Sequence, residues 1–144
     1  MNAKKILFGL ASTLLALTSV AHLLGHFATE AVGNNPTENQ IYSLITTYIW
    51  NVAGTELTLW QLFRGYSLVF AALLAFVGVL NLAVLPGSTR GLLNRITAVD
   101  LAFLGLLLGI SLRHFPTPPT YAFALIITLY LLSLMVGNGG SQES

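Results

Sequence analysis

Four long apolar runs dominate the pattern of hydrophobic and polar positions along this chain. Stretches without Asp, Glu, Lys or Arg cover residues 6–29, 65–89 and 114–142, and a fourth apolar run lies between Leu101 and Leu112. A membrane-spanning helix needs about 20 apolar residues. We therefore expect spans at residues 6–27, 57–85, 91–112 and 119–136, the third including Arg95 and Asp100. The pattern predicts an all-α fold, an integral membrane four-helix bundle that forms a single transmembrane domain over residues 1–144.

The connections between the runs predict how the spans follow one another. Short links containing proline join the second, third and fourth spans, so these spans are expected to be antiparallel neighbours. The longer first loop begins a helix at Asn35-Pro36-Thr37-Glu38, with an N-cap, a proline in the first turn and an acidic third residue. Apolar residues then recur on one helical face at Ile41, Leu44, Ile45, Tyr48 and Ile49. We expect a short amphipathic helix at about residues 36–50 and a polar tail at residues 137–144.

The amphipathic helix carries no Lys or Arg, which distinguishes it from a typical surface-binding anchor. We therefore expect it to cover the outer mouth of the bundle. The first span raises a different question, because Lys4 and Lys5 followed by Ser19-Val20-Ala21 also fit a secretory signal cleaved after Ala21. Its apolar run continues to Phe27, about 22 residues, which is span length rather than signal length. We expect the segment to be retained.

Composition agrees with this pattern and excludes several classes of function. The chain is 55% hydrophobic and 8% charged, whereas soluble domains contain about 25% charged residues. The lipid bilayer is therefore the expected partner. The absence of cysteine rules out disulfides and thiolate metal sites, and a net charge of +1 gives no reason to expect nucleic-acid binding.

The positive residues predict an orientation. Four of them lie on one side of the predicted bundle (Lys4, Lys5, Arg90 and Arg95), and two lie near the other (Arg64 and Arg113). The positive-inside rule then places both termini in the cytoplasm. The long first loop would face outward.

Two histidines at the outer end of the first span begin a candidate ligand-binding mouth. His22 and His26 are one helical turn apart, so their rings can converge on one point. The expected order of the spans brings five more polar or aromatic residues to the same end: Glu56, Trp60, Arg64, Arg113 and His114. Ionisable residues at membrane depth are expensive and are functional candidates.

This outer mouth has several interpretations. Ser12, Ser19 and His26 recur at seven-residue spacing, which favours a seam for helix packing. A zinc site would use His22 and His26 with His114 or Glu56, although no HExxH glutamate is present. A bis-histidine haem would pair His114 with His22 or His26. A lipid or quinone would place its head group at His22, Arg64 or Arg113, and either arginine could instead extend to the lipid head groups.

A second polar group lies toward the cytoplasmic side. Asn94, Thr97 and Asp100 follow one another at three-residue spacing, and Asn81 is near the inner end of the preceding span. A carboxyl group at this depth needs a partner, so the four residues are expected to form an intramembrane polar clasp. The alternative is a proton-carrying carboxyl group at Asp100.

Three segments carry a resemblance to known proteins: LTSVAHLLGHF, LWQLFRGYSLVFAALL and LRHFPTPPTYAF. They resemble a group of small uncharacterised bacterial four-span membrane proteins, and the layout is similar to DoxX-like membrane proteins. The resemblance implies the four-span fold. Some DoxX-type proteins are linked to oxidoreductase systems as accessory subunits, which would imply a respiratory partner.

Two classes of function follow. The first, which we expect, is a non-catalytic component: an accessory subunit of a larger membrane complex or homo-oligomer, or a binder of a small lipophilic ligand. The second is a small membrane oxidoreductase or a metal- or haem-binding protein that uses His22, His26 and His114.

Overall fold

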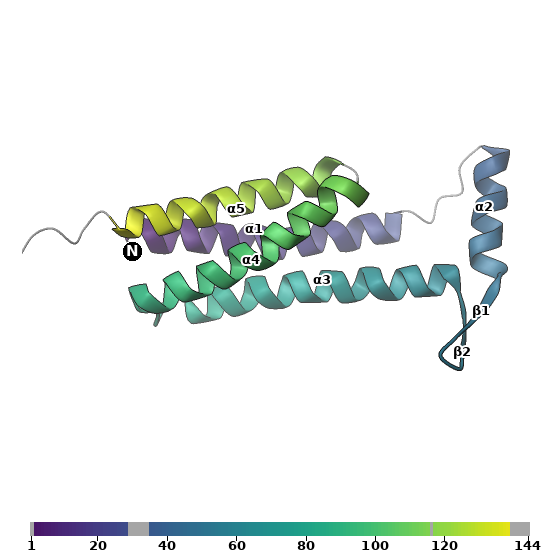
Figure 1. Ribbon diagram of the computed structural model, residues 1–144, viewed down its shortest axis with the longest axis horizontal. Coiled ribbons are helices and arrows are strands. Elements are labelled where there is room, and N and C mark those ends of the chain that lie inside the picture. Colours follow the sequence, from purple (N-terminus) through teal and green to yellow (C-terminus); the bar gives the residue numbers. More distant parts are fainter. Residues whose placement is uncertain (1, 29–34, 116, 139–144) are drawn as a thin grey trace, which may run out of the picture. The chain divides into compact units, whose positions relative to one another are not determined.

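The computed structural model describes residues 2–28, 35–115 and 117–138. Figure 1 shows their helices and strands, which are α1 (Ala3–Ala28), α2 (Pro36–Thr47), β1 (Ile49–Val52), β2 (Thr55–Thr58), α3 (Leu59–Val84), α4 (Arg90–His114) and α5 (Thr117–Asn138). Helices α1, α3, α4 and α5 are long and apolar enough to cross a membrane. The predicted all-α membrane fold with four spans is confirmed, with a small β-hairpin added to it.

The chain divides into two compact units. The first contains Met1–Thr18 and Leu74–Ser144, and the second contains Ser19–Leu73. The first unit therefore holds α4 and α5 with the beginning of α1 and the end of α3. The second holds α2 and the hairpin with the end of α1 and the beginning of α3.

Burial in the first unit is typical of a protein that lies in lipid. Large apolar side chains point outward, among them Val99 (69% exposed) and Leu112 (70% exposed). The buried positions combine apolar residues such as Phe8, Leu104 and Phe123 with a set of polar and charged ones, namely Lys4, Ser12, Asn81, Ser88, Thr97, Asp100, Ser111 and Ser133. Lipid tails are as apolar as leucine, so small and polar residues hold such helices together.

Helices α1 and α3 are in close contact at Gly78 within the first unit. A Cβ atom at Gly78 would lie 2.8 Å from the backbone nitrogen of Ala16 and 2.9 Å from the carbonyl oxygen of Ser12. These distances are too short for any side chain, so glycine is required there. The small residues Ser12 and Ala16 are four positions apart and form the matching surface on α1.

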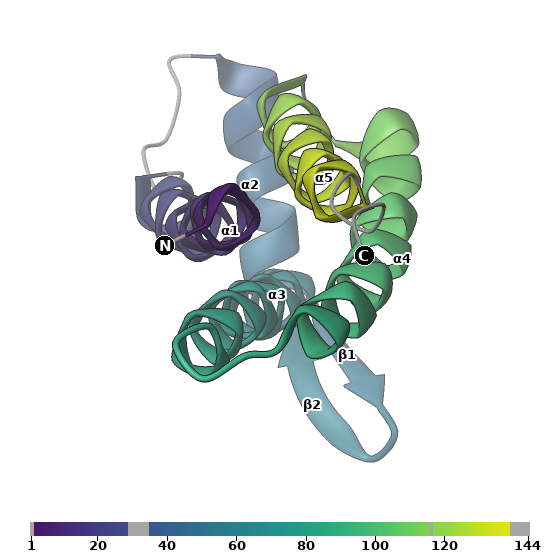
Figure 2. The same ribbon diagram turned by 90° about the vertical axis from the view of Figure 1, so that its left-hand side faces the viewer.

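Helices α4 and α5 lie side by side (Figure 2). Thr89 caps α4, because its side chain accepts a hydrogen bond from the Leu92 amide, as expected for a threonine at this position. Near the link to α5, the hydroxyls of Ser111 and Thr120 are 2.7 Å apart and hydrogen-bonded. Helix α5 continues to Asn138, so residues 137 and 138 of the expected polar tail belong to the helix. The remainder of that tail lies outside the described residues.

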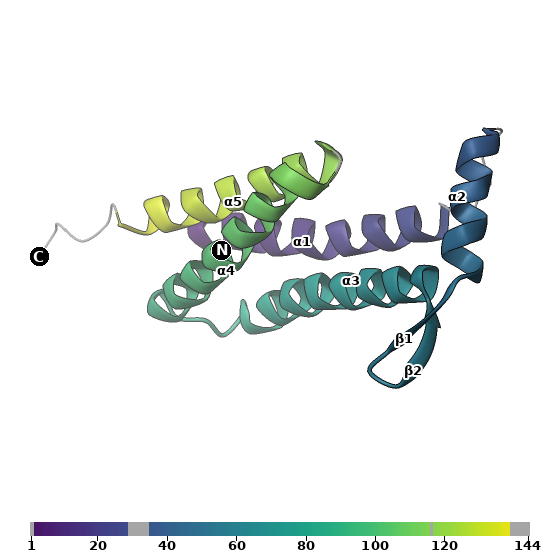
Figure 3. The ribbon, with the colours of Figure 1, turned by 45° about the vertical axis from the view of Figure 1, so that its right-hand side comes forward.

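In the second unit, α2 begins as predicted. Asn35 is its N-cap and accepts a hydrogen bond from the Thr37 amide at 3.0 Å, with Pro36 in the first turn. Figure 3 shows α2 lying across the direction of the first half of α3. None of the side chains of α2 is buried, although the helix contacts β2 and the ring of Tyr42 lies 5.6 Å from that of Trp60.

The hairpin corrects the predicted boundaries. The amphipathic helix was expected to reach residue 50 but ends at Thr47, and α3 begins at Leu59 rather than at Leu57. Residues between them form the antiparallel strands β1 and β2, with Val52 opposite Thr55. Ala53 and Gly54 both have positive φ, 51° and 84°, which is the type I′ turn that suits the twist of a hairpin. Ala53 is an unusual residue for this conformation, and the usual Asn-Gly signal is missing.

Candidate functional site

Polar contacts join the end of α1 to the beginning of α3 within the second unit. The Ser19 hydroxyl donates to the carbonyl oxygen of Ala71 at 2.7 Å. One turn further along, Nε2 of His22 lies 2.9 Å from the Ser67 hydroxyl, and the His22 ring meets Phe70 edge-on with centroids 5.2 Å apart. His22 therefore forms a hydrogen bond between two membrane-spanning helices, the kind of contact expected of a packing seam.

His26 has different surroundings from His22. It is half-buried, and its ring meets Phe27 edge-on at a centroid distance of 5.2 Å. Among the described residues, no three His, Asp or Glu side chains come close enough together to hold a metal ion. The spacing of His22 and His26 along α1 thus remains the main support for a metal or haem site.

The other predicted mouth residues lie on several elements. Glu56 is exposed on β2, opposite Asn51 of β1, while Trp60 contacts Tyr42 of α2 and Arg64 is half-buried in the second turn of α3. These belong to the second unit with His22 and His26. Arg113 and His114 are exposed in the last turn of α4, in the first unit. The seven-residue mouth stays a prediction.

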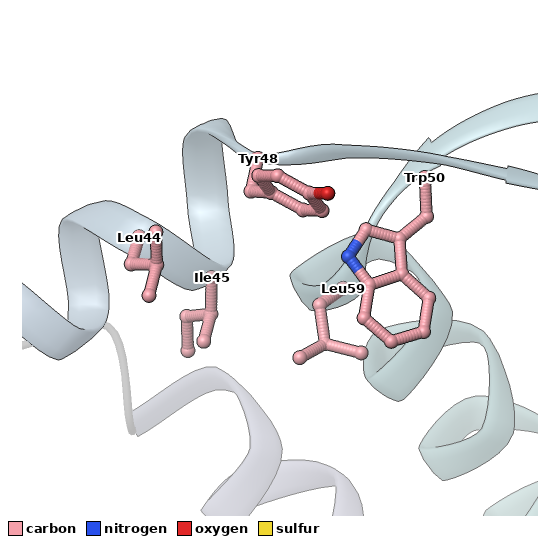
Figure 4. A pocket seen from close by; sticks show the side chains of 5 residues that line it. All are labelled: Leu44, Ile45, Tyr48, Trp50 and Leu59. Carbon is pink, nitrogen blue, oxygen red and sulfur yellow. The ribbon is translucent and has the colours of Figure 1, made fainter.

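An apolar pocket in the second unit was not anticipated from the sequence. We call it the α2–β1 pocket and define it by its five lining residues, Leu44, Ile45, Tyr48, Trp50 and Leu59. Its volume is about 290 Å³, and Figure 4 shows these side chains arranged around a common space. The signal in the sequence was present but incomplete: the apolar face of α2 was recognised, whereas Trp50 was assigned to the helix instead of to a strand.

The hairpin explains why this pocket exists. Ending α2 at Thr47 turns the chain at Tyr48, whose backbone is extended, and β1 then carries Trp50 alongside the helix. The Trp50 and Tyr48 rings meet edge-on with centroids 6.2 Å apart. Leu59, the first residue of α3, closes another side of the space in Figure 4. Three elements therefore supply one apolar lining.

Four polar residues of the first unit form a connected chain of hydrogen bonds. The Asn81 amide donates to Asp100 Oδ2 at 2.7 Å and to the Tyr130 hydroxyl at 3.0 Å. Ser12 Oγ lies 3.0 Å from the Tyr130 hydroxyl and donates to the carbonyl oxygen of Phe8. We call Ser12, Asn81, Asp100 and Tyr130 the polar seam.

The predicted clasp overlaps this seam only in part. Asn81 and Asp100 are bonded to each other, but Asn94 accepts a hydrogen bond from the Lys4 ammonium. The Thr97 hydroxyl donates to the Leu93 carbonyl oxygen of its own helix. Sequence reasoning did not identify Tyr130, Ser12 or Lys4 as partners, because they lie on helices far away in the sequence.

Comparisons with family models, with curated proteins and with solved structures give no match. Four long apolar helices, outward-facing apolar side chains and buried, hydrogen-bonded polar groups are together what a bilayer requires of a protein. The chain is a multi-pass integral membrane protein.

Proposed function

We propose that this protein is a non-catalytic membrane component that binds a small lipophilic molecule in the α2–β1 pocket. The observation that carries the proposal is an apolar hollow of about 290 Å³ lined by aromatic and aliphatic side chains. Ligand sites are typically concave, mostly apolar and supplied with a few polar groups. Here the polar groups at the lining are the Tyr48 hydroxyl and the Trp50 indole N–H.

The shape and chemistry of the pocket restrict the ligand. The volume is at the lower end of the usual range for ligand pockets, so it suits a ring-sized group or a short stretch of alkyl chain. No charged side chain lines it, which disfavours an ionic ligand because a buried charge needs a partner. An uncharged ring with a carbonyl acceptor, as in a quinone, matches the two aromatic donors.

The position of the pocket next to a membrane-spanning helix favours a ligand that enters from the bilayer. Leu59 is both a lining residue and the first residue of a membrane-spanning helix. Tyrosine and tryptophan are the residues enriched at membrane–water interfaces. A lipophilic molecule would therefore reach the pocket without crossing bulk water.

A non-catalytic role is favoured over the oxidoreductase alternative by the surroundings of His22. Its Nε2 atom is hydrogen-bonded to Ser67, so metal coordination through that atom would first have to break an interhelical contact. Absorption spectra and metal analysis of the purified protein test the alternative. A Soret band or stoichiometric metal that is lost in both His22→Ala and His26→Ala would overturn the non-catalytic assignment.

The setting we propose is the bacterial inner membrane with both termini in the cytoplasm. The support is the excess of positive residues at Lys4, Lys5, Arg90 and Arg95. The resemblance to DoxX-like proteins supports an accessory role beside a respiratory complex or within a homo-oligomer. A C-terminal reporter that is active only in the cytoplasm should give signal, and silence of that reporter would reverse the orientation.

Tryptophan fluorescence tests the pocket directly. The chain has two tryptophans, Trp50 and Trp60, so Trp60→Phe leaves Trp50 as the single reporter in the pocket. In that background, decylbenzoquinone added to the protein in dodecylmaltoside micelles should quench the emission with a saturable curve. Filling the pocket with Ile45→Phe should remove the saturable part.

Ile41→Phe is the matched control, since Ile41 lies one turn earlier on α2 and does not line the pocket. Its curve should be the same as that of the parent. Linear quenching that is identical in the parent, Ile41→Phe and Ile45→Phe would indicate partition of the quinone into the micelle, and would refute a quinone-type ligand. A saturable curve with a long-chain alkane label instead would assign the pocket to an alkyl chain.

A further inference from the structure

The outer face of α4 carries a second hollow, in the first unit and separate from the α2–β1 pocket. It is lined by six residues of this one helix, Gly105, Leu106, Gly109, Ile110, Arg113 and His114, and has a volume of about 340 Å³. We call it the α4 groove. Because the residues recur at i, i+4 and i+8, the groove follows the axis of the helix.

The floor of the α4 groove is open. Gly105 and Gly109 lie on successive turns of α4, and neither has a side chain that would fill the groove. A Cβ atom built on either would meet no atom of the described chain within 4 Å. Leu106 and Ile110 beside them are exposed. The floor from Gly105 to Arg113 extends eight residues, about 12 Å at 1.5 Å per residue. That length fits within one leaflet of a hydrocarbon core about 30 Å thick.

One end of the α4 groove is cationic. Arg113 and His114 are exposed in the last turn of α4, where a membrane-spanning helix reaches the head-group level. Arginine keeps its charge at all physiological pH values, and histidine offers at least one N–H donor. The chain has no Asp or Glu between residues 101 and 142. Along α4 the preceding acid, Asp100, is 13 residues away, about 20 Å, and it is bonded to Asn81.

We propose that the α4 groove is a binding site for an anionic phospholipid. One acyl chain lies over Gly105 and Gly109, and the phosphate is bound by Arg113 and His114. The groove is complementary to such a lipid: an apolar trough as long as part of one leaflet ends in a guanidinium group, which binds phosphate with paired N–H donors. This site does not depend on the proposed function of the α2–β1 pocket, which belongs to the other unit.

A second copy of the chain is a less suitable occupant. Glycines four residues apart are also a common contact between membrane helices. Two copies inserted in one membrane with the same orientation would be parallel, and a symmetric contact on this face would place the two Arg113 side chains at the same depth. Like charges brought together near lipid are unfavourable, whereas a phosphate neutralises the arginine.

The experiment is native mass spectrometry of the full chain, delipidated in detergent and then exposed to one lipid at a time. Dioleoylphosphatidylglycerol and dioleoylphosphatidylcholine share acyl chains and differ in head-group charge. We expect one retained phosphatidylglycerol per chain and at least about fivefold less phosphatidylcholine, because the lipid's net charge decides binding at Arg113. This comparison uses the unmodified protein, so it does not depend on any variant folding.

Two variants separate the floor from the charge. Gly109→Leu fills the floor and leaves Arg113 in place, and Arg113→Gln removes the charge and leaves the floor open. Each should lower retained phosphatidylglycerol about tenfold, the equivalent of losing one charge-assisted contact. The matched controls on the same helix are Gly91→Leu and Arg95→Gln, an open glycine and an exposed arginine outside the groove. Both should bind as the parent does.

Three outcomes would overturn the proposal. Equal retention of the two lipids by the unmodified protein would mean that the net charge of the lipid does not decide binding, so the site would not be specific for an anionic phospholipid. Unchanged binding in Gly109→Leu together with Arg113→Gln would place the lipid elsewhere. A dimer that is present in the unmodified protein and lost in Gly109→Leu, without a lipid difference, would assign the face to a second copy.

Discussion

In the first unit, four polar side chains that form the polar seam are buried among apolar helices and bonded to one another. In the second unit, the apolar side chains of the α2–β1 pocket surround an open hollow, and Tyr48 and Trp50 are 57% and 48% exposed. The difference follows from the solvent of each region. Between helices in lipid, burying apolar side chains contributes little to the free energy of association, so polar contacts hold the helices together. In water, by contrast, an exposed apolar hollow is unfavourable unless something fills it.

Breaking the polar seam should have the largest effect on stability. Asn81→Leu removes the donor to both Asp100 and Tyr130 and leaves a buried carboxyl group without that partner. We expect the free energy of unfolding to fall by about 2–3 kcal/mol, measured by titration with sodium dodecyl sulfate in maltoside micelles. Asp100→Asn keeps an acceptor of the same shape, so its loss should be less than about 1 kcal/mol. An Asn81→Leu protein as stable as the parent would refute the structural role of the seam.

The close approach of α1 and α3 predicts the next effect. Gly78→Ala forces a Cβ atom against the backbone of Ser12 and Ala16, and overpacking of this kind costs about 1–3 kcal/mol. Gly65→Ala is the matched control on the same helix, because a Cβ there meets no described atom within 4 Å. The same titration should separate the two variants clearly. Equal stability of the two would mean that the helices are not in contact at Gly78.

The His22–Ser67 hydrogen bond should contribute less. Interhelical hydrogen bonds in membrane proteins average about 0.6 kcal/mol in double-mutant cycles. A cycle of His22→Ala, Ser67→Ala and the double variant should therefore give a coupling energy of about this size. A coupling energy near zero would mean that the His22–Ser67 hydrogen bond does not form, and His22 would then be available to bind a ligand.

Changing the α2–β1 pocket should affect stability least and binding most. Trp50→Ala removes a half-exposed ring from the lining, and we expect the free energy of unfolding to change by no more than about 0.5 kcal/mol. Because this variant lacks the fluorescent reporter of the pocket, binding is measured by equilibrium dialysis of decylbenzoquinone against the protein in dodecylmaltoside micelles, and the saturable part of the binding should disappear. A large loss of stability with unchanged binding would make Trp50 a structural residue. The proposed difference between a stabilising polar seam and a ligand-binding pocket would then be wrong.

The sequence predicted the elements whose signals are local. Runs of about 20 apolar residues identify membrane spans because each helix must satisfy its own backbone in lipid. The start of α2 was predicted correctly because a cap and a proline act within one turn. The hairpin was missed because a type I′ turn at Ala53-Gly54 lacks the expected asparagine, and its apolar strand residues continue the helical pattern of α2.

The candidate sites were less predictable, because they depend on residues distant in the sequence. Asn81 and Asp100 could be paired from the order of the spans, since a short link joins their helices. The seven-residue spacing placed Ser12 on a packing stripe, and Ser12 is indeed buried. Its partner Tyr130 could not be identified, because it lies 118 residues away in the sequence and no local pattern connects the two helices. The α2–β1 pocket depends on where α2 ends, and a boundary error of three residues moved Trp50 away from it.

The amino-acid sequence by itself determined that this chain is a membrane protein, how many spans it has and where each begins to within a few residues. Those properties depend on the transfer of local segments from water to lipid. The tertiary structure alone decided which polar groups are partners, that Gly78 is a contact point and that Trp50 lines a pocket. These features depend on which side of each helix is turned toward its neighbours. Because the helices are apolar on nearly every side, only their packing against one another determines this.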